Sequence, residues 1–364
     1  MSTIGEQAGS FSVYEARSYW YIACRSAELR NELLQVRLWG EPLVLFRDEQ
    51  GKAHCLRDRC AHRNVPLSEG KRMGSRIQCP YHGWEFDGEG RCQKIPALKD
   101  CQPSQAHSVP SFSVTEQQGY IWVYTEVNAT PHVEPFVFPH LDNKDYVSVH
   151  YQADFEASLH ATAENILDVP HTAFLHKGLF RGGEPNPIET IVRSYSDRVE
   201  CEFVGEPRPS GLLGKILAPG GGDQMQHMDR FLLPSVAQVE YKIGHRGHLL
   251  TTSCLSPLSS FETRMYAVVS LRKSLWLQLL RPVITPIAMK VVQQDQEMLA
   301  KQTQRIRDYG GEQYAYTEAD TLCPGIIKLL RRASKEKIPI STEHGNGAAS
   351  DEDALSVKRG TLCA

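Results

Sequence analysis

The stretch CAHRNVPLSEGKRMGSRIQCPYHGW, residues 60–84, contains two short motifs that each pair a cysteine with a histidine. The first motif is Cys60-Ala-His62 and the second is Cys79-Pro-Tyr-His82, with sixteen residues between them. Thiolates and imidazoles are both ligands for transition metals. Because the cysteine and the histidine of each motif are close neighbours in the chain, the four side chains can converge on one metal centre.

Three interpretations of this pattern compete. Scattered core cysteines and histidines rarely form two paired motifs within 23 residues. A structural zinc ion takes two cysteines and two histidines, whereas in a Rieske [2Fe–2S] cluster two cysteines hold one iron and two histidines hold the other. The flanking residues favour the cluster: Pro80 and Gly83 fit tight loops whose N–H groups can point at cluster sulfurs, and Tyr81 and Trp84 can supply an apolar cover.

With the Gly88 turn and Ile95-Pro96 that follow, the segment resembles the Rieske domain of ring-hydroxylating oxygenases. The resemblance implies that a Rieske-type [2Fe–2S] cluster is bound by the four residues of the two motifs: Cys60, His62, Cys79 and His82.

A second group of metal-binding residue types lies about 90 residues downstream, in the sequence ENILDVPHTAFLH: Asn165, Asp168, His171 and His176. On a regular helix, two residues five positions apart point about 140° away from each other. One metal ion could therefore be reached by both histidines only after a break, which Pro170 provides. Non-haem Fe(II) oxygenases use two histidines and one carboxylate on one side of the iron, which leaves positions open for O₂ and substrate.

The spacing Asn-x-x-Asp-x-x-His-x-x-x-x-His is similar to the mononuclear iron motif of the same oxygenase family. The resemblance implies that His171 and His176 are ligands of a mononuclear Fe(II). It also implies that Asp168 bridges to a Rieske histidine of a neighbouring subunit, and that Asn165 lies near the iron without being a strong ligand.

The third iron ligand is expected to be a carboxylate on a helix farther along the chain, for which there are four candidates: Asp295, Glu297, Asp308 and Glu312. In QDQEMLAKQ, residues 294–302, Asp295 stands where the family carries its acid, a few residues ahead of a leucine and a glutamine. Asp295 is therefore the preferred candidate and Glu297 the second. The alternative for Asp295 is a solvated charge on a helix face.

Hydrophobic periodicity and turn residues predict a mixed chain. We expect strands at 43–46, 119–125, 236–243, 248–255 and 264–271, and helices at 157–167, at 287–306 and from Pro324 onward. With the resemblance, this order predicts an α+β protein. A small all-β Rieske domain is joined to a larger catalytic domain of the helix-grip or START-like kind, an antiparallel sheet flanked by helices.

Three regions follow from these patterns. Residues 1–130 are expected to hold the Rieske domain, with a core at about 20–127, and residues 131–340 the catalytic domain. The polar, small-residue sequence of residues 341–364 predicts a flexible C-terminal tail. The Gly/Pro-rich stretch at 207–223 reads as a lid, an entrance or a tolerated surface loop.

Composition narrows the function classes. The chain has 364 residues, 41% of them hydrophobic, and a net charge of −3, which excludes global disorder and gives no reason to expect a nucleic-acid partner. The N-terminal residues have no signal-peptide pattern, so a cytoplasmic protein is expected. The apolar residues 275–292 are interrupted by charges and prolines, so they do not predict a spanning helix, and membrane contact through them is not favoured.

The resemblance implies a terminal oxygenase that uses O₂ to hydroxylate or oxidatively demethylate a small hydrophobic ring substrate, aromatic or heterocyclic. Electrons would come from a ferredoxin or flavin reductase partner, and from NAD(P)H only through that reductase, since the chain has no Gly-x-Gly-x-x-Gly fingerprint. Electron transfer between subunits implies a homotrimer.

Two alternatives stay open for the function. One is an oxygenase acting on a sterol-like or other polycyclic lipid. The other, from a different class, is a non-enzymatic iron–sulfur electron carrier, for which the second motif would have no purpose. Apolar residues suggest a substrate entrance, although they fit an ordinary core equally well: Phe174, Leu175, Leu179, Phe180, Leu212 and Leu213.

Overall fold

The computed structural model describes residues 13–98, 103–176, 187–206, 225–244, 247–273, 275–340, 351 and 353–363, and for residues 275–287 and 363 it describes the backbone alone. The stretch at 207–223 and the entrance residues Leu179, Phe180, Leu212 and Leu213 lie outside the described residues. The chain divides into two units: residues 16–137 with 256–259, and residues 138–255 with 260–364 and the N-terminal fifteen.

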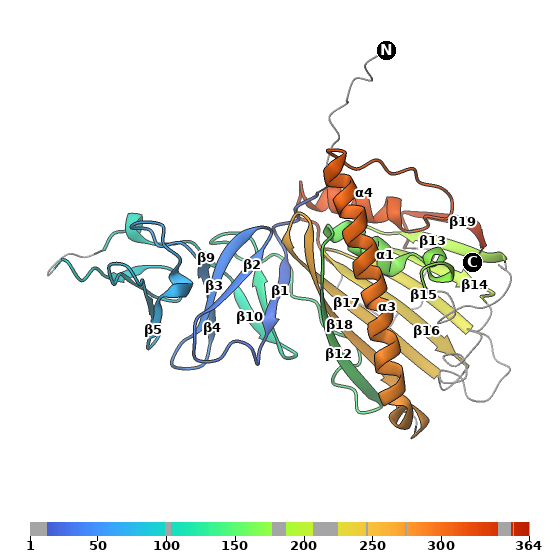
Figure 1. The fold of residues 1–364 in the computed structure, drawn as a ribbon, viewed down its shortest axis with the longest axis horizontal. Coiled ribbons are helices and arrows are strands. Elements are labelled where there is room, and N and C mark those ends of the chain that lie inside the picture. Colours follow the sequence, from blue (N-terminus) through green and yellow to red (C-terminus); the bar gives the residue numbers. More distant parts are fainter. Residues whose placement is uncertain are drawn as a thin grey trace, which may run out of the picture. The chain divides into compact units, whose positions relative to one another are not determined.

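The smaller unit is built from three antiparallel sheets, drawn in blue to teal in Figure 1. The first has the order β1 (Trp20–Arg25), β11 (Tyr120–Tyr124), β10 (Val114–Gln117). The second has the order β2 (Leu34–Leu38), β3 (Glu41–Arg47), β4 (Ala53–Arg57), β9 (Ser111–Phe112). The third has the order β5 (Lys71–Met73), β6 (Arg76–Gln78), β7 (Glu85–Phe86), β8 (Cys92–Lys94).

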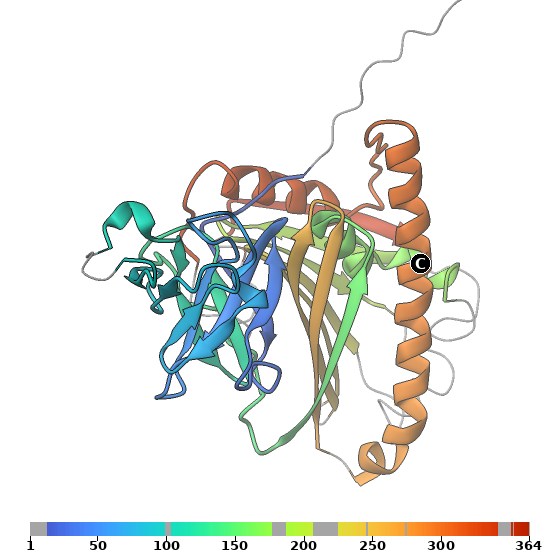
Figure 2. The same ribbon diagram turned by 60° about the vertical axis from the view of Figure 1, so that its left-hand side comes forward.

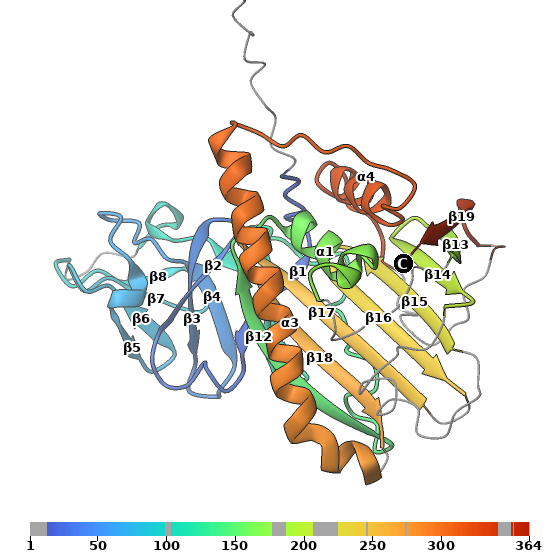
Figure 3. The same ribbon diagram turned by 45° about the vertical axis from the view of Figure 1, so that its right-hand side comes forward.

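The larger unit contains an eight-stranded antiparallel sheet, whose strands lie side by side in Figure 3. Its order is β12 (Tyr146–Phe155), β18 (Glu262–Arg272), β17 (Gly247–Ser259), β16 (Val236–Ile243), β15 (Met225–Leu232), β14 (Arg198–Val204), β13 (Pro187–Ser194), β19 (Ser356–Cys363). The predicted strands at 236–243, 248–255 and 264–271 are confirmed as β16 and as parts of β17 and β18.

Helices cover one face of this sheet. The helix α1 (Leu159–Leu167) packs on β15 and β16, α3 (Leu275–Asp308) on β12, and α4 (Cys323–Ala333) on β14. Figure 2 shows the long α3 from a second direction. The predicted class, a small all-β domain with a larger antiparallel sheet and few helices, is confirmed. Among the described residues, none of the helices combines the length and the apolar character needed to cross a membrane.

The expectation of a flexible tail at 341–364 is wrong for residues 356–363, which form β19 on the edge of the large sheet. β19 pairs antiparallel with β13, from Ser356 opposite Ser194 to Cys363 opposite Pro187. Most of its side chains are exposed, but Leu362 is only 3% exposed. An edge strand needs few apolar residues because one face and one edge meet water, so its composition resembles that of a loop.

Candidate metal centres

The two cysteine–histidine loops of the smaller unit share one backbone pattern. In each loop the cysteine N–H donates to the carbonyl five residues ahead, and the N–H four residues ahead donates back to the cysteine carbonyl. The two distances are 2.9 and 3.0 Å in the loop of Cys60, and 2.8 and 3.2 Å in the loop of Cys79. The fourth residue has a positive φ in both cases, 62° at Asn64 and 70° at Gly83. Each of the two motifs therefore lies in a tight turn, and the two turns have the same backbone geometry.

The cysteines of the two motifs are more deeply buried than the histidines. Cys60 and Cys79 are 0% and 3% exposed and pack in an apolar cluster with Phe46, Leu56 and Ile77, among others, whereas His62 is half-buried and His82 is exposed. Burial raises the pKa of the Cys60 thiol to about 11, while the backbone N–H groups of His62 and Arg63 oppose this shift. Both thiols are free of disulfide bonds. The two cysteines therefore lie inside, and the two histidines are more exposed than the cysteines.

Aromatic rings lie against both histidines of the two loops. The ring centroids of His62 and His82 lie 4.5 Å apart. The indole of Trp84 stacks on His62 at 4.7 Å, and Tyr81 lies 3.9 Å from His82 but stays 63% exposed. Gly83 lies so near Pro96 that a β-carbon added to Gly83 would be 3.1 Å from the Cγ of Pro96. The loops are closely packed around the four donors.

The donors of the two loops fit a two-iron cluster better than a single ion. The Nδ1 atom of His62 is buried and has no hydrogen-bond partner among the described residues. In the described part of the chain, one group of three or more Cys, His, Asp or Glu ligand atoms lies within 4.8 Å of one another, and it is in the larger unit. A tetrahedral zinc ion would hold its donors within about 4 Å of one another. Cysteines on one iron and histidines on another need no such closeness.

In the larger unit, a helix end and a turn present the second histidine pair. Ser158 caps α1 by accepting from the N–H of Ala161, and the helix ends at Leu167 as predicted. Asp168 is extended, and a short 3-10 turn over Pro170–Ala173 reverses the chain. The break that Pro170 introduces therefore brings His171 and His176 to one point.

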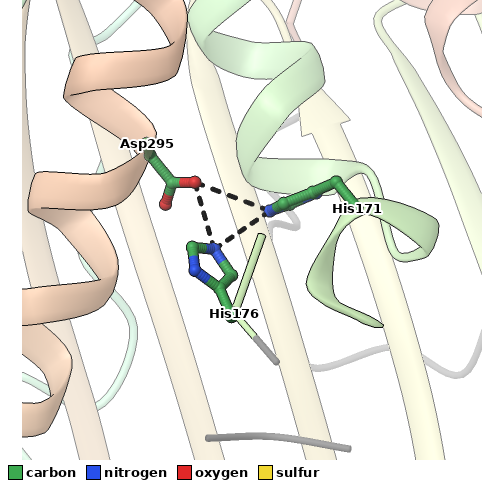
Figure 4. Close-up of side chains that lie close together, drawn as sticks. All are labelled: His171, His176 and Asp295. Carbon is green, nitrogen blue, oxygen red and sulfur yellow. Dashed lines mark hydrogen bonds and ion pairs between the residues drawn. The ribbon is translucent and has the colours of Figure 1, made fainter. Parts of the chain in front are cut away.

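Figure 4 shows three side chains whose ligand atoms form a triangle. The Nε2 atoms of His171 and His176 are 3.2 Å apart. The Oδ1 atom of Asp295, on α3, lies 3.1 Å from Nε2 of His176 and 3.6 Å from Nε2 of His171. Ligands on metal bonds of about 2.1 Å at angles of about 90–115° are about 3.0–3.5 Å apart. The triangle therefore has the size needed to bind one metal ion.

Two corners of the triangle, His176 and Asp295, make a hydrogen bond with a further side chain. The Nδ1 of His176 donates to Oε1 of Gln294 at 2.9 Å, which leaves its Nε2 lone pair facing the other two ligand atoms. The Nδ2 of Asn165 donates to Oδ1 of Asp295 at 3.4 Å. At the third corner, Oδ2 of Asp168 lies 3.3 Å from Nδ1 of His171, which makes no hydrogen bond among the described residues. This pattern of oriented histidines and carboxylates is typical of metal sites.

The structure separates the four carboxylates considered as third ligand. The Glu297 side chain is exposed and accepts from Gln293 at 3.2 Å, and Asp308 accepts from Gln304 and Arg305. Glu312 lies 3.7 Å from His160. Asp295 is the candidate that reaches the two histidines. The sequence analysis missed Gln294, although it stands beside Asp295, because its role depends on how α3 meets the histidine turn.

Glu164, a half-buried acid, lies on α1 directly before Asn165. Burial, with the charges of Asp320, Glu312 and Asp168, raises the pKa of Glu164 to about 8, although the hydroxyl of Tyr316 donates to it at 3.4 Å. Glu164 therefore holds a proton at neutral pH. Phe174, expected at an apolar entrance or in the core, is 86% exposed and belongs to no core.

Comparison with known families agrees with this geometry. Residues 19–113 match the Rieske [2Fe-2S] domain family, and residues 155–332 match the family described as the vanillate O-demethylase oxygenase C-terminal domain. The chain thus combines a Rieske [2Fe-2S] domain with a group of three side chains in the larger unit whose spacing suits a metal ion. More specifically, the chain belongs to the Rieske oxygenases.

Several curated proteins are similar to parts of the chain. Chlorophyllide a oxygenase of Chlamydomonas reinhardtii is 38% identical over 173 residues, 47% of this chain and 26% of that protein. The 4beta-methylsterol monooxygenase of Methylococcus capsulatus is 32% identical over 223 residues, 58% of each chain. The chain spans 26–35% of the length of the chlorophyllide a oxygenases of Chlamydomonas and Arabidopsis thaliana.

Solved structures share the fold. Dicamba monooxygenase bound to 3,6-dichlorosalicylic acid superposes with a TM-score of 0.75 at 22% identity, covering 88% of this chain and 98% of that one. NdmB of Pseudomonas putida CBB5 gives a TM-score of 0.72 at 21% identity, covering 89% and 94%. At these identities the similarity establishes the fold alone.

Proposed function

We propose that the protein is the terminal oxygenase of a multicomponent Rieske system. It would use O₂ and two electrons from a ferredoxin or flavin reductase to hydroxylate or oxidatively demethylate a hydrophobic ring substrate. The observation that carries the proposal is the triangle of His171, His176 and Asp295 in a chain that also holds the two cysteine–histidine loops. A stand-alone electron carrier would need only the loops.

The reaction balances as one substrate, one O₂, two electrons and two protons, giving hydroxylated substrate and one water. When bound, a mononuclear Fe(II) would supply O₂ binding and activation, which side chains alone cannot provide. His171, His176 and Asp295 would hold the iron, and Gln294 would keep His176 in the tautomer that exposes Nε2. Glu164, protonated at neutral pH, could hold one of the protons that the reaction consumes.

The electron route would run through Cys60, His62, Cys79 and His82 as ligands of a [2Fe–2S] cluster. Histidine ligation raises the potential of such a cluster above that of an all-cysteine one, so a ferredoxin-like or flavin donor can reduce it. The exposed His82 is the member of the set best placed to meet another molecule. We propose that Asp168, 32% exposed and 3.3 Å from His171, connects the two centres across a homotrimer interface.

The substitution His171→Ala tests the proposal. Product formation should disappear, because one of three iron ligands is lost, while the absorption and EPR signals of the iron–sulfur cluster should persist. His107→Ala is the control, since His107 lies near Trp84 in the smaller unit and is no ligand of either set. Retained turnover in the His171 variant would remove the mononuclear site from the reaction and favour the electron-carrier alternative.

A sterol-like or other polycyclic lipid is the second candidate substrate class. It is favoured by the 32% identity to the 4beta-methylsterol monooxygenase. The substrate class can be found by following O₂ uptake and product mass with a ferredoxin–reductase pair and a panel of aromatic acids, heterocycles and sterols. A gain of one oxygen or a loss of a methyl group on one class would identify it.

A further inference from the structure

A buried group of titratable side chains lies in the large sheet, apart from the metal triangle. His227, on β15, donates from Nδ1 to Oε2 of Glu206 at 2.5 Å and from Nε2 to Oδ1 of Asp229 at 2.9 Å. Its ring is stacked between Phe203 of β14 and Tyr241 of β16, with centroids at 4.4 and 4.2 Å. His227 and Asp229 are each 1% exposed, and Glu206 is 7% exposed.

The group contains one imidazole and two carboxyl groups. Burial lowers the pKa of His227, but the carboxylates of Asp229 and Glu206 outweigh burial and raise that pKa to about 9, so the imidazole carries a proton and one positive charge. Burial raises the pKa of Asp229, whereas the charges of His227 and Arg230 oppose that shift. The second oxygen of Asp229, Oδ2, is buried and has no hydrogen-bond partner among the described residues. A buried acceptor without a donor is destabilising, so this oxygen is expected to take a donor from a bound molecule.

The group points to the same side of the sheet as the metal triangle. In β14, Val199 contacts α4, because a β-carbon on Gly325 would lie 2.9 Å from its Cγ2. Alternate residues of a strand share a face, so Cys201 and Phe203 also face the helices. His227 is registered opposite Phe203 and Asp229 opposite Cys201. The helix α1, which leads into the histidine turn, packs on β15 and β16 from this side (Figure 3).

We propose that Glu206, His227 and Asp229 form a substrate subsite that accepts a hydrogen bond from a hydroxyl or amine on an otherwise apolar ring. This proposal rests on the oxygenase function proposed above. The Oδ2 atom of Asp229 is the acceptor, and the rings of Phe203 and Tyr241 fix the position of the imidazolium that orients it. A ring that carries a carboxylate is disfavoured, because a carboxylate has no hydrogen to donate to Oδ2 and its burial without a donor would cost free energy.

The test measures binding rather than turnover. The holoenzyme is titrated with three probes of matched shape, 2-naphthol, 2-methoxynaphthalene and 2-naphthoate, and dissociation constants are obtained by calorimetry. We expect 2-naphthol to bind at least about ten-fold more tightly than the other two, since it alone can donate a hydrogen bond to the buried carboxylate oxygen.

The variant Asp229→Asn places an amide donor where the free carboxylate oxygen was. The preference for 2-naphthol should be lost, and the affinity for 2-naphthoate should rise, while the melting temperature and the cluster spectrum show that the protein is folded. Glu200→Gln is the matched control, since Glu200 is a buried acid of β14 on the opposite face, where it pairs with Arg198 and Arg230. It should keep the wild-type preference.

A wild-type protein that does not prefer 2-naphthol, or that binds none of the probes, would overturn the proposal. So would an Asp229→Asn variant that retains the preference. Because His171→Ala should abolish turnover but keep the probe preference, failure of the subsite and failure of the oxygenase function are distinguishable.

Discussion

Gln294 orients one histidine of the metal triangle by accepting the Nδ1–H of His176 at 2.9 Å. Replacing it by alanine should lower iron affinity about 10–100-fold, the usual effect of removing such an orienting partner. The measurement is iron content and turnover as a function of added Fe(II). Gln293→Ala is the control, because the neighbouring Gln293 is exposed and donates to Glu297 of α3 at 3.2 Å. Equal iron affinity in the two variants would contradict this role for Gln294.

Glu164 gives the second prediction at this scale, because its pKa is raised from 4.5 to about 8. Between these values the folded state binds more protons than the unfolded state, so stability falls as pH rises from about 4.5 to 8. Glu164→Gln should remove this part of the slope, at most about 1.4 kcal/mol per pH unit. Urea unfolding at several pH values measures it. Glu318→Gln, at an exposed position, should leave the wild-type profile, and an unchanged profile in Glu164→Gln would argue against the raised pKa.

Sequence spacing predicts which residues come together within one turn better than it predicts contacts between segments that are distant in the chain. The approach of His171 and His176 follows from the helix break at Pro170, which is local. The choice of Asp295 over Glu297 depends on which side of α3 faces the turn, and the sequence alone left both open. Nothing in the sequence joins Glu206, His227 and Asp229, because that group depends on strand register.

At the scale of elements, β19 is a strand whose amino-acid composition predicts a flexible tail. Leu362 is 3% exposed and opposite Ile188 of β13, itself 1% exposed. Leu362→Ala should lower the free energy of unfolding by about 2–4 kcal/mol. Val357→Ala, in the same strand but 39% exposed, should cost under about 1 kcal/mol. Chemical denaturation distinguishes the two, and a negligible effect of Leu362→Ala would mean that the strand does not stay docked in solution.

The elements themselves were largely predictable, and their order in the sheet was not. Alternating apolar residues predict β16, β17 and β18 because each of these strands carries its own pattern. The pairing of β12 with β18 and of β13 with β19 joins segments more than a hundred residues apart. Such contacts depend on the packing of the whole domain, which a local pattern does not encode.

At the scale of the whole molecule, the proposed electron route between subunits can be tested by mixing two inactive chains. His82→Ala should disable the cluster and keep the triangle, whereas His171→Ala should do the reverse. Each variant alone should be inactive. In randomly mixed trimers of a cyclic, head-to-tail kind, a subunit keeps its triangle in half of the cases, and the neighbour that serves it keeps its cluster in half of those.

Co-expression of the two variants should therefore restore about a quarter of the wild-type activity per subunit, since both conditions must hold at once. Variants purified separately and mixed without subunit exchange should remain inactive, which serves as the control. If electrons passed only within one chain, no mixed trimer would hold a complete route, and co-expression would restore nothing. Partial recovery thus requires transfer across a subunit boundary, and its size reports how many neighbours can serve each triangle: two serving neighbours instead of one would raise the expected recovery to about three eighths.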